Sequence, residues 1–278
     1  ESLTEVPNWM LTRYEEYYER MDAELAIQSS DPELLTGINP ELIAKSRKAT
    51  AQKFEPLRKY ENTTNWCVVA TASPAWARKV FPTVPAKEAA EKLWAEIFAS
   101  CRIYDPDPVA AWQAHVEKLK KYRDYLNAQK FSALHYRSPN TDLTIGLPEK
   151  HLWQGAQAEF KNGITGIPNL PTEEVFTTPH KDKVDGVVSS TMPLNYGGVL
   201  IEDFNLTFEN GRIVKVTAKK GEETLKKLIE TDENAARLGE CALVPNSSPI
   251  SQRKILFYNT LFDENASCHI AIGNSYRD

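Results

Sequence analysis

The sequence predicts an α/β protein in two parts, a helix-rich α/β N-terminal domain over residues 1–129 and a strand-rich α+β domain over residues 130–278. Three observations predict it. Apolar residues recur at helical spacing in the first part, one apolar run between them has the character of a strand, and after Gln129 short alternating stretches are punctuated by Gly, Pro and Asn. A chain of 278 residues is long enough for two ordinary domains.

Three helices and one strand are predicted in the first part. Residues 40–60 are rich in helix formers, and Asn39 stands where an N-cap is expected. Residues 66–72 form an apolar run that predicts a buried strand. Residues 86–100 and 108–129 both carry apolar side chains at spacings of three, four and seven, which is typical of helices with one buried face.

Strands are predicted through the second part. Residues 131–136 and 142–147 alternate in polarity and are separated by turn-forming residues. A clearer hairpin is predicted over residues 205–216, because Asn210 and Gly211 at its centre tolerate the positive φ angles of a type I′ turn.

Composition and charge exclude several classes of protein. The 33 Lys and Arg residues against 38 Asp and Glu give a formal net charge of −5, which disfavours a general polyanion binder. The longest apolar run is far shorter than the roughly 20 residues of a membrane-spanning helix. Four widely spaced cysteines without a Cys-x-x-Cys pair predict reduced thiols in a cytoplasmic protein. The acidic charge balance and the short apolar runs predict that it binds neither nucleic acid nor membrane.

Two common kinds of enzyme motif are also missing. The glycine pairs Gly163/Gly166 and Gly197/Gly198 match neither a dinucleotide-binding fingerprint nor a phosphate-binding loop. No Gly-x-Ser-x-Gly sequence is present, so a serine hydrolase of the α/β type is not indicated.

Two segments carry carboxylates that are candidates for chemistry. Glu173 and Glu174 are adjacent in a Pro-bounded segment, and in an extended chain they point to opposite faces, so only one of them faces a given site. A solvated acidic loop explains the same pair. Glu240 follows Gly239 and precedes an apolar run, where an isolated charge needs a partner or marks a helix C-terminus.

A histidine and a tyrosine near the end of the chain complete the candidate set. His269 lies in an otherwise apolar stretch, as a metal ligand or a core histidine does. Tyr276 follows seven residues later and has a surface aromatic as its alternative. Together, Glu174, Glu240 and His269 offer oxygen and nitrogen donors on three strand-like segments, an arrangement found in hydrolytic metal sites.

The same segments resemble a known family. Residues 170–179, Gly239 with Glu240, and residues 268–273 with Tyr276 match in order and spacing the aminopeptidase T and aminopeptidase S family of dinuclear metallopeptidases. Residues 140–148 also look like family sequence, and the similarity extends over the whole chain.

The resemblance implies an enzyme that removes N-terminal residues from peptides with two divalent cations, such as zinc, cobalt or manganese. It implies that Glu174, Glu240 and His269 are metal ligands and that Tyr276 lies beside the metals. Glu173 is a weaker candidate for proton transfer or amine binding, with a supporting or solvated role as the alternative. The family also implies a homodimer for the full-length protein and peptide substrates with a free N-terminus.

One departure from the family pattern carries an expectation of its own. Family members complete the site with a His-x-Asp pair a short way beyond the equivalent of Asp278, and this sequence also lacks an initiator Met. We therefore expect an internal fragment, incomplete at both ends, that binds metal weakly and is inactive.

Two other classes of protein are alternatives to an enzyme. The incomplete ligand set and the aromatic-rich first part suggest a non-catalytic binding or oligomerisation module. A basic stretch with interspersed tyrosines suggests nucleic-acid binding, although a solvated helix face fits the acidic total better. The residues of this basic stretch are Lys118, Lys120, Lys121, Tyr122, Arg123, Tyr125 and Lys130.

Overall fold

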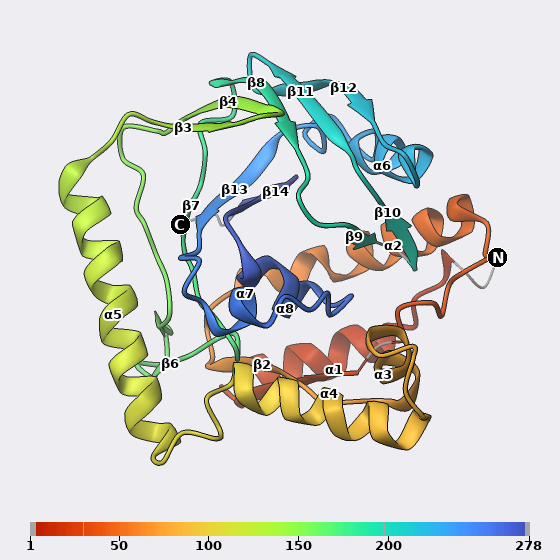
Figure 1. Ribbon diagram of the computed structural model, residues 1–278, viewed down its shortest axis with the longest axis vertical. Helices are drawn as coiled ribbons and strands as arrows, with labels where there is room; N and C mark the ends of the chain where they lie inside the picture. The colour runs from red at the N-terminus through yellow and green to blue at the C-terminus, as the bar shows by residue number, and fades with distance from the viewer. Residues whose placement is uncertain (1–3, 30, 197, 276–278) are drawn as a thin grey trace.

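The computed structural model describes residues 4–29, 31–196 and 198–275 and confirms the predicted α/β class. Its first part is dominated by helices, most of which lie in the lower half of Figure 1, while the long helix of residues 108–129 runs up one side. The elements are α1 (Asn8–Glu19), β1 (Glu24–Gln28), α2 (Pro40–Phe54), the 3₁₀ helix η2 (Glu55–Tyr60), β2 (Trp66–Ala70), α3 (Pro74–Val80), α4 (Ala86–Ser100) and α5 (Pro108–Gln129).

The predicted helices are confirmed, and their ends follow from local chemistry. The side chain of Asn39 accepts a hydrogen bond from the backbone N–H of Glu41 and caps α2. Asp107 caps α5 in the same way, through the backbone N–H of Ala110. The predicted strand β2 is half-buried rather than buried. It pairs in parallel with β1, a strand that periodicity did not indicate, and bridges Asn169 through Val68.

The second part is rich in strands and short helices. Its elements are β3 (Ala133–Ser138), β4 (Thr141–Gly146), β5 (Ala158–Glu159), β6 (Thr165–Gly166), β7 (Val175–Thr177), β8 (Val184–Ser189), β9 (Leu194–Tyr196), β10 (Val199–Ile201), β11 (Asn205–Glu209), β12 (Arg212–Thr217), α6 (Glu222–Ile229), β13 (Leu238–Leu243), α7 (Pro249–Arg253), α8 (Thr260–Asp263), the 3₁₀ helix η3 (Glu264–Ala266) and β14 (His269–Ile272).

Two antiparallel sheets organise this second part. The larger has the strand order β12-β11-β8-β4-β3 and lies at the top of Figure 1. Its β11–β12 hairpin turns at Asn210 and Gly211 with φ angles of 48° and 79°, which confirms the predicted turn. The smaller sheet, β14-β13-β7, lies between the larger sheet and the helices of the first part.

The buried core consists of two clusters, and each draws residues from both sides of residue 129. One cluster joins Val116 and Leu119 of α5 to apolar residues of both sheets, including Leu143 and Cys241. The other joins α3 and α4 to the segment of residues 250–266. Apolar packing therefore ties the helical layer to the small sheet, while the domain boundary at residue 129 stays a prediction.

The helices within the described ranges are too short or too polar to span a membrane. None of them combines the length and the apolar character that crossing a bilayer requires.

Candidate metal centre

The pairing register of the small sheet places three candidate side chains on one of its faces. Ala242 in the central strand β13 pairs with His269 of β14 on one side and with Phe176 of β7 on the other. Glu240 lies two residues before Ala242, and Glu174 lies two residues before Phe176. Side chains alternate between faces with a period of two, so Glu174, Glu240 and His269 face the same way and surround the small Ala242 side chain.

Glycines bring the backbone close enough for this arrangement. A Cβ atom on Gly155 would lie 2.6 Å from the carbonyl oxygen of Glu174, and one on Gly239 would lie 2.0 Å from the carbonyl oxygen of Asn274. Both distances are too short for any side chain. Gly239 also stands at the register shift between Leu238 and Glu240, which confirms Glu240 in a strand and not at a helix end.

His269 is oriented by its own backbone neighbourhood. Its Nδ1 donates a hydrogen bond to the carbonyl oxygen of Ser267 at 3.1 Å. This bond leaves Nε2 to face the two carboxylates, as in many metal-binding histidines.

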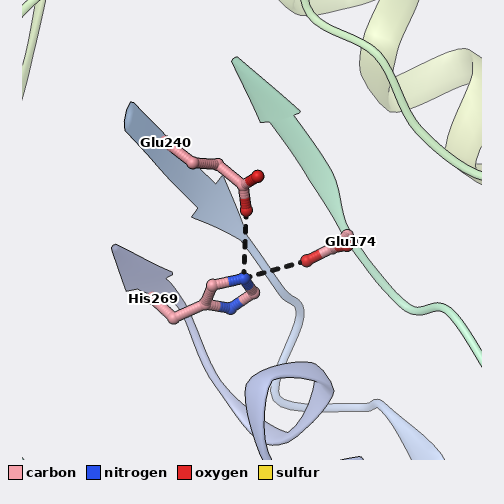
Figure 2. Close-up of side chains that lie close together, drawn as sticks. All are labelled: Glu174, Glu240 and His269. Atoms are coloured by element: carbon pink, nitrogen blue, oxygen red, sulfur yellow. Dashed lines mark ion pairs between the residues drawn. The ribbon is translucent and has the colours of Figure 1, made fainter. Parts of the chain in front are cut away.

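The three side chains converge on one point, as Figure 2 shows. Nε2 of His269 lies 3.0 Å from Oε2 of Glu174 and 3.4 Å from Oε1 of Glu240. One donor atom from each residue lies within 4.8 Å of the other two. Burial by itself lowers the pKa of His269, but the ion pairs with Glu174 and Glu240 outweigh it and raise that pKa to about 11.

This donor set fits a divalent cation. Oε2 of Glu174 and Nε2 of His269 are buried, and their contact with each other at 3.0 Å is an ion pair that lacks hydrogen-bond geometry. A cation held between two carboxylates and an imidazole satisfies these atoms, and the mixture of oxygen and nitrogen donors suits Zn²⁺ and related ions.

Glu264 is a further carboxylate at this place that the sequence analysis missed. It lines a cavity of about 260 Å³ together with Glu174 and Glu240. Burial, together with the charge of Glu174, raises the pKa of Glu264 to about 8. The available signal was an acidic pair, Asp263 and Glu264, ahead of the apolar stretch that contains His269.

The cavity has an anionic lining. Trp66 and Phe176 contribute aromatic walls, and no Lys, Arg or His lines it in the part of the chain that the structure describes. Glu174 and Glu240 therefore make this cavity favourable for cations, while the raised pKa of Glu264 keeps that carboxyl largely protonated near neutral pH.

Glu173 takes a different place from its neighbour. Its carboxylate is 2% exposed and pairs with Arg102, with 2.6 Å between Oε1 and Nη1. As expected for adjacent residues of an extended chain, only one of the two glutamates faces the site. Glu174 lies beside Glu240 and His269, and Glu173 does not. Tyr276, the predicted catalytic residue, lies outside the described residues.

Comparison with known proteins defines the class of this fold and site. The chain belongs to the thermophilic metalloprotease (M29) family, whose model matches residues 1–278. This membership confirms the resemblance found in the sequence and identifies the chain as a metalloaminopeptidase, a hydrolase.

Particular relatives are similar along nearly the whole chain. The chain is 51% identical to aminopeptidase AmpS of Bacillus subtilis, with 99% of this chain and 68% of the relative covered. It is 46% identical to aminopeptidase T of Thermus thermophilus, covering 100% of this chain and 69% of the relative. The solved structure of wild-type AmpT from Thermus thermophilus has a TM-score of 0.91 at 45% identity, over 99% of this chain and 68% of that one.

Proposed function

We propose that this chain forms the metal centre of an enzyme that removes the N-terminal residue from peptides, with Glu174, Glu240 and His269 as metal ligands. The observation that carries the proposal is the convergence of these three donors on one face of the small sheet. The buried contact between Oε2 of Glu174 and Nε2 of His269, which lacks hydrogen-bond geometry, supports the assignment.

Two divalent ions are proposed, with zinc, cobalt or manganese as candidates. A bound divalent ion supplies Lewis-acid chemistry, because it polarises the scissile carbonyl and lowers the pKa of a coordinated water. Glu264 offers a fourth donor beside the three ligands, since it lines the same cavity as Glu174 and Glu240. Four donors are better matched to two ions than three are.

The residues of the cavity also account for action at a free N-terminus. A protonated α-amine is a small cation, and Glu174, Glu240 and Glu264 offer it carboxyl groups at this cavity, where His269 already pairs with Glu174 and Glu240. An internal peptide bond presents no such charge. Binding of the amine therefore selects the first residue of a chain and sets its carbonyl at a fixed distance from the ligands.

Three further elements of the proposal rest on the resemblance. Tyr276 is proposed to donate its phenolic proton in a hydrogen bond to the oxygen that becomes negatively charged as the carbonyl is attacked. A His-x-Asp pair beyond residue 278 is proposed to complete the ligand set. A cytoplasmic location and a homodimer are proposed for the full-length protein.

The test compares metal content and hydrolysis. Residues 1–278 and a longer form that includes the His-x-Asp pair are each loaded with Zn²⁺, Co²⁺ or Mn²⁺, analysed by mass spectrometry and assayed on aminoacyl p-nitroanilides. We expect about two ions per chain and release of the chromophore in the longer form. A longer form that binds no metal and stays inert contradicts the proposal and favours a non-catalytic binding module.

A further inference from the structure

Glu173 is an unusual residue for its position, because it is a nearly fully buried carboxylate one residue before a proposed ligand. Burial of an unpaired charge costs several kcal/mol, so such a group needs a partner. Arg102 provides it with two contacts, 2.6 Å from Nη1 to Oε1 and 3.0 Å from Nη2 to Oε2. A guanidinium that meets both carboxylate oxygens fixes the orientation of the carboxylate as well as its charge.

Hydrogen bonds to the backbone hold Thr172 and Glu173, the two residues before Glu174. Nε2 of His115, on α5, donates to the carbonyl oxygen of Thr172 at 2.8 Å. The backbone N–H of Glu173 donates to Oδ1 of Asn265 at 2.7 Å. The segment that leads into Glu174 is therefore held from a helix on one side and from η3 on the other.

Asn265 links this network to a second acidic residue of the site. It is fully buried, and its amide donates to the carbonyl oxygen of Leu261 at 3.1 Å. Its own carbonyl oxygen accepts a hydrogen bond from the hydroxyl of Ser248 at 2.8 Å. Because Asn265 follows Glu264 directly, one side chain ties together the backbone next to Glu174 and the backbone next to Glu264.

Arg102 is itself anchored at the corner between α4 and α5. Its guanidinium lies 5.0 Å from the ring centre of Trp112, and the indole N–H of Trp112 donates to the carbonyl oxygen of Cys101 at 2.8 Å. Its φ angle of 60° is rare for a residue with a side chain, which indicates a backbone held by its surroundings.

We infer that Arg102 and Glu173 are positioning residues that set the orientation of Glu174, and through Asn265 that of Glu264, toward the metal centre. This inference rests on the proposed function, since it assigns a role relative to the same site. Partners behind metal ligands fix ligand geometry before the ion arrives, and their loss typically weakens metal binding by about 10–100-fold. The pair also makes the helical layer a structural part of the centre.

The test measures metal affinity apart from stability. Glu173→Gln removes the charge at nearly constant shape, and the double variant Arg102→Gln/Glu173→Gln removes both charges, so that neither is left buried alone. Glu96→Gln is the matched control, because Glu96 is a largely buried carboxylate paired with Arg253 at 3.1 Å. Zn²⁺ dissociation constants are measured by competition with a chromophoric chelator, and melting temperatures are measured in EDTA.

We expect both Glu173 variants to bind Zn²⁺ about 10–100-fold more weakly than the unaltered chain, and Glu96→Gln to bind it normally. The double variant should recover much of the melting temperature lost in Glu173→Gln but none of the affinity. Unchanged affinity with a lower melting temperature overturns the inference and leaves the pair a purely structural one. If Glu173→Gln does not fold, the double variant decides. The variants and the unaltered protein are compared in the longer form that includes the His-x-Asp pair, and an unaltered longer form that binds no Zn²⁺ overturns the proposed function, and the inference with it.

Discussion

Nε2 of His269 lies 3.0 Å from Oε2 of Glu174, although the two residues come from opposite edges of the small sheet. His269 begins the edge strand β14, and Glu174 directly precedes the other edge strand, β7. The central strand β13 contributes Glu240 between them. Two carboxylates and one imidazole at this separation are costly without a cation or a proton to share, because like charges repel strongly in a partly buried site.

Removal of the Glu240 carboxylate is expected to weaken metal binding strongly. Glu240→Gln keeps the shape of the side chain but loses the charge that attracts the ion. We expect a rise of about 100-fold in the Zn²⁺ dissociation constant, equivalent to roughly 2.8 kcal/mol. Isothermal titration calorimetry measures it. Glu223→Gln is the control, since that side chain is 81% exposed on α6, and equal affinity in the two variants contradicts the ligand assignment.

Bound metal is expected to stabilise the folded chain. An ion that binds only the folded state adds about 2.7 kcal/mol to the free energy of unfolding when its concentration is 100 times its dissociation constant. Calorimetric melting with Zn²⁺ and then with excess EDTA should show a reversible rise in melting temperature. The same rise in His269→Gln would show that the ion binds elsewhere.

Gly155→Ala is expected to disturb the site without touching a donor atom. The added Cβ meets the carbonyl oxygen of Glu174 at 2.6 Å, so one of the two backbones has to shift. We expect a loss of about 1–3 kcal/mol in the free energy of unfolding together with weaker metal binding. Gly166→Ala is the control, because its Cβ meets only the ring of Phe160, at 3.2 Å. Urea titrations that rank the two variants equally contradict the prediction.

His115 is expected to make the chain less stable in acid. Burial lowers its pKa, and the charge of Arg102 lowers it further, while Glu173 acts in the opposite direction. Below about pH 6.5 the unfolded chain therefore binds more protons at this position than the folded chain, so the free energy of unfolding falls as the pH falls.

The measurement for this prediction is urea unfolding of the metal-free chain at pH 7.5 and pH 5.5. His115→Gln keeps a donor for the carbonyl of Thr172 but does not titrate, and we expect a smaller loss of stability in acid. His135→Gln is the control, because the side chain of His135 is 53% exposed. An identical acid loss in the unaltered chain and in His115→Gln counts against the prediction.

The four cysteines are expected to react at very different rates. Burial raises the pKa of Cys101 and of Cys241 to about 12, which keeps both as unreactive thiols near neutral pH. Cys268 is exposed and directly precedes His269. Mass spectrometry after brief treatment with a maleimide at pH 7 should find Cys268 labelled first, and Cys268→Ser should lose this fast reaction. Early labelling of Cys241 would show that the small sheet opens.

Much of the secondary structure was determined by local sequence. The periodic apolar residues of α4 and α5, the Asn39 cap and the Asn210–Gly211 turn act within a few positions of the chain, and the structure confirms them. The strand β1 escaped prediction. Its side chains Leu25 and Ile27 are more than 60% exposed, and its existence depends on pairing with β2, which lies far along the chain.

The site divides in the same way. The sequence by itself determined which residue types were available, and its resemblance to a family singled out Glu174, Glu240 and His269. Only the tertiary structure decided that these three face one another, because their positions depend on the register of three strands. It also separated Glu173 from Glu174 and brought in Glu264 and Arg102. No local pattern announces such partners, since burial and charge pairing between distant segments exist only after the chain has folded.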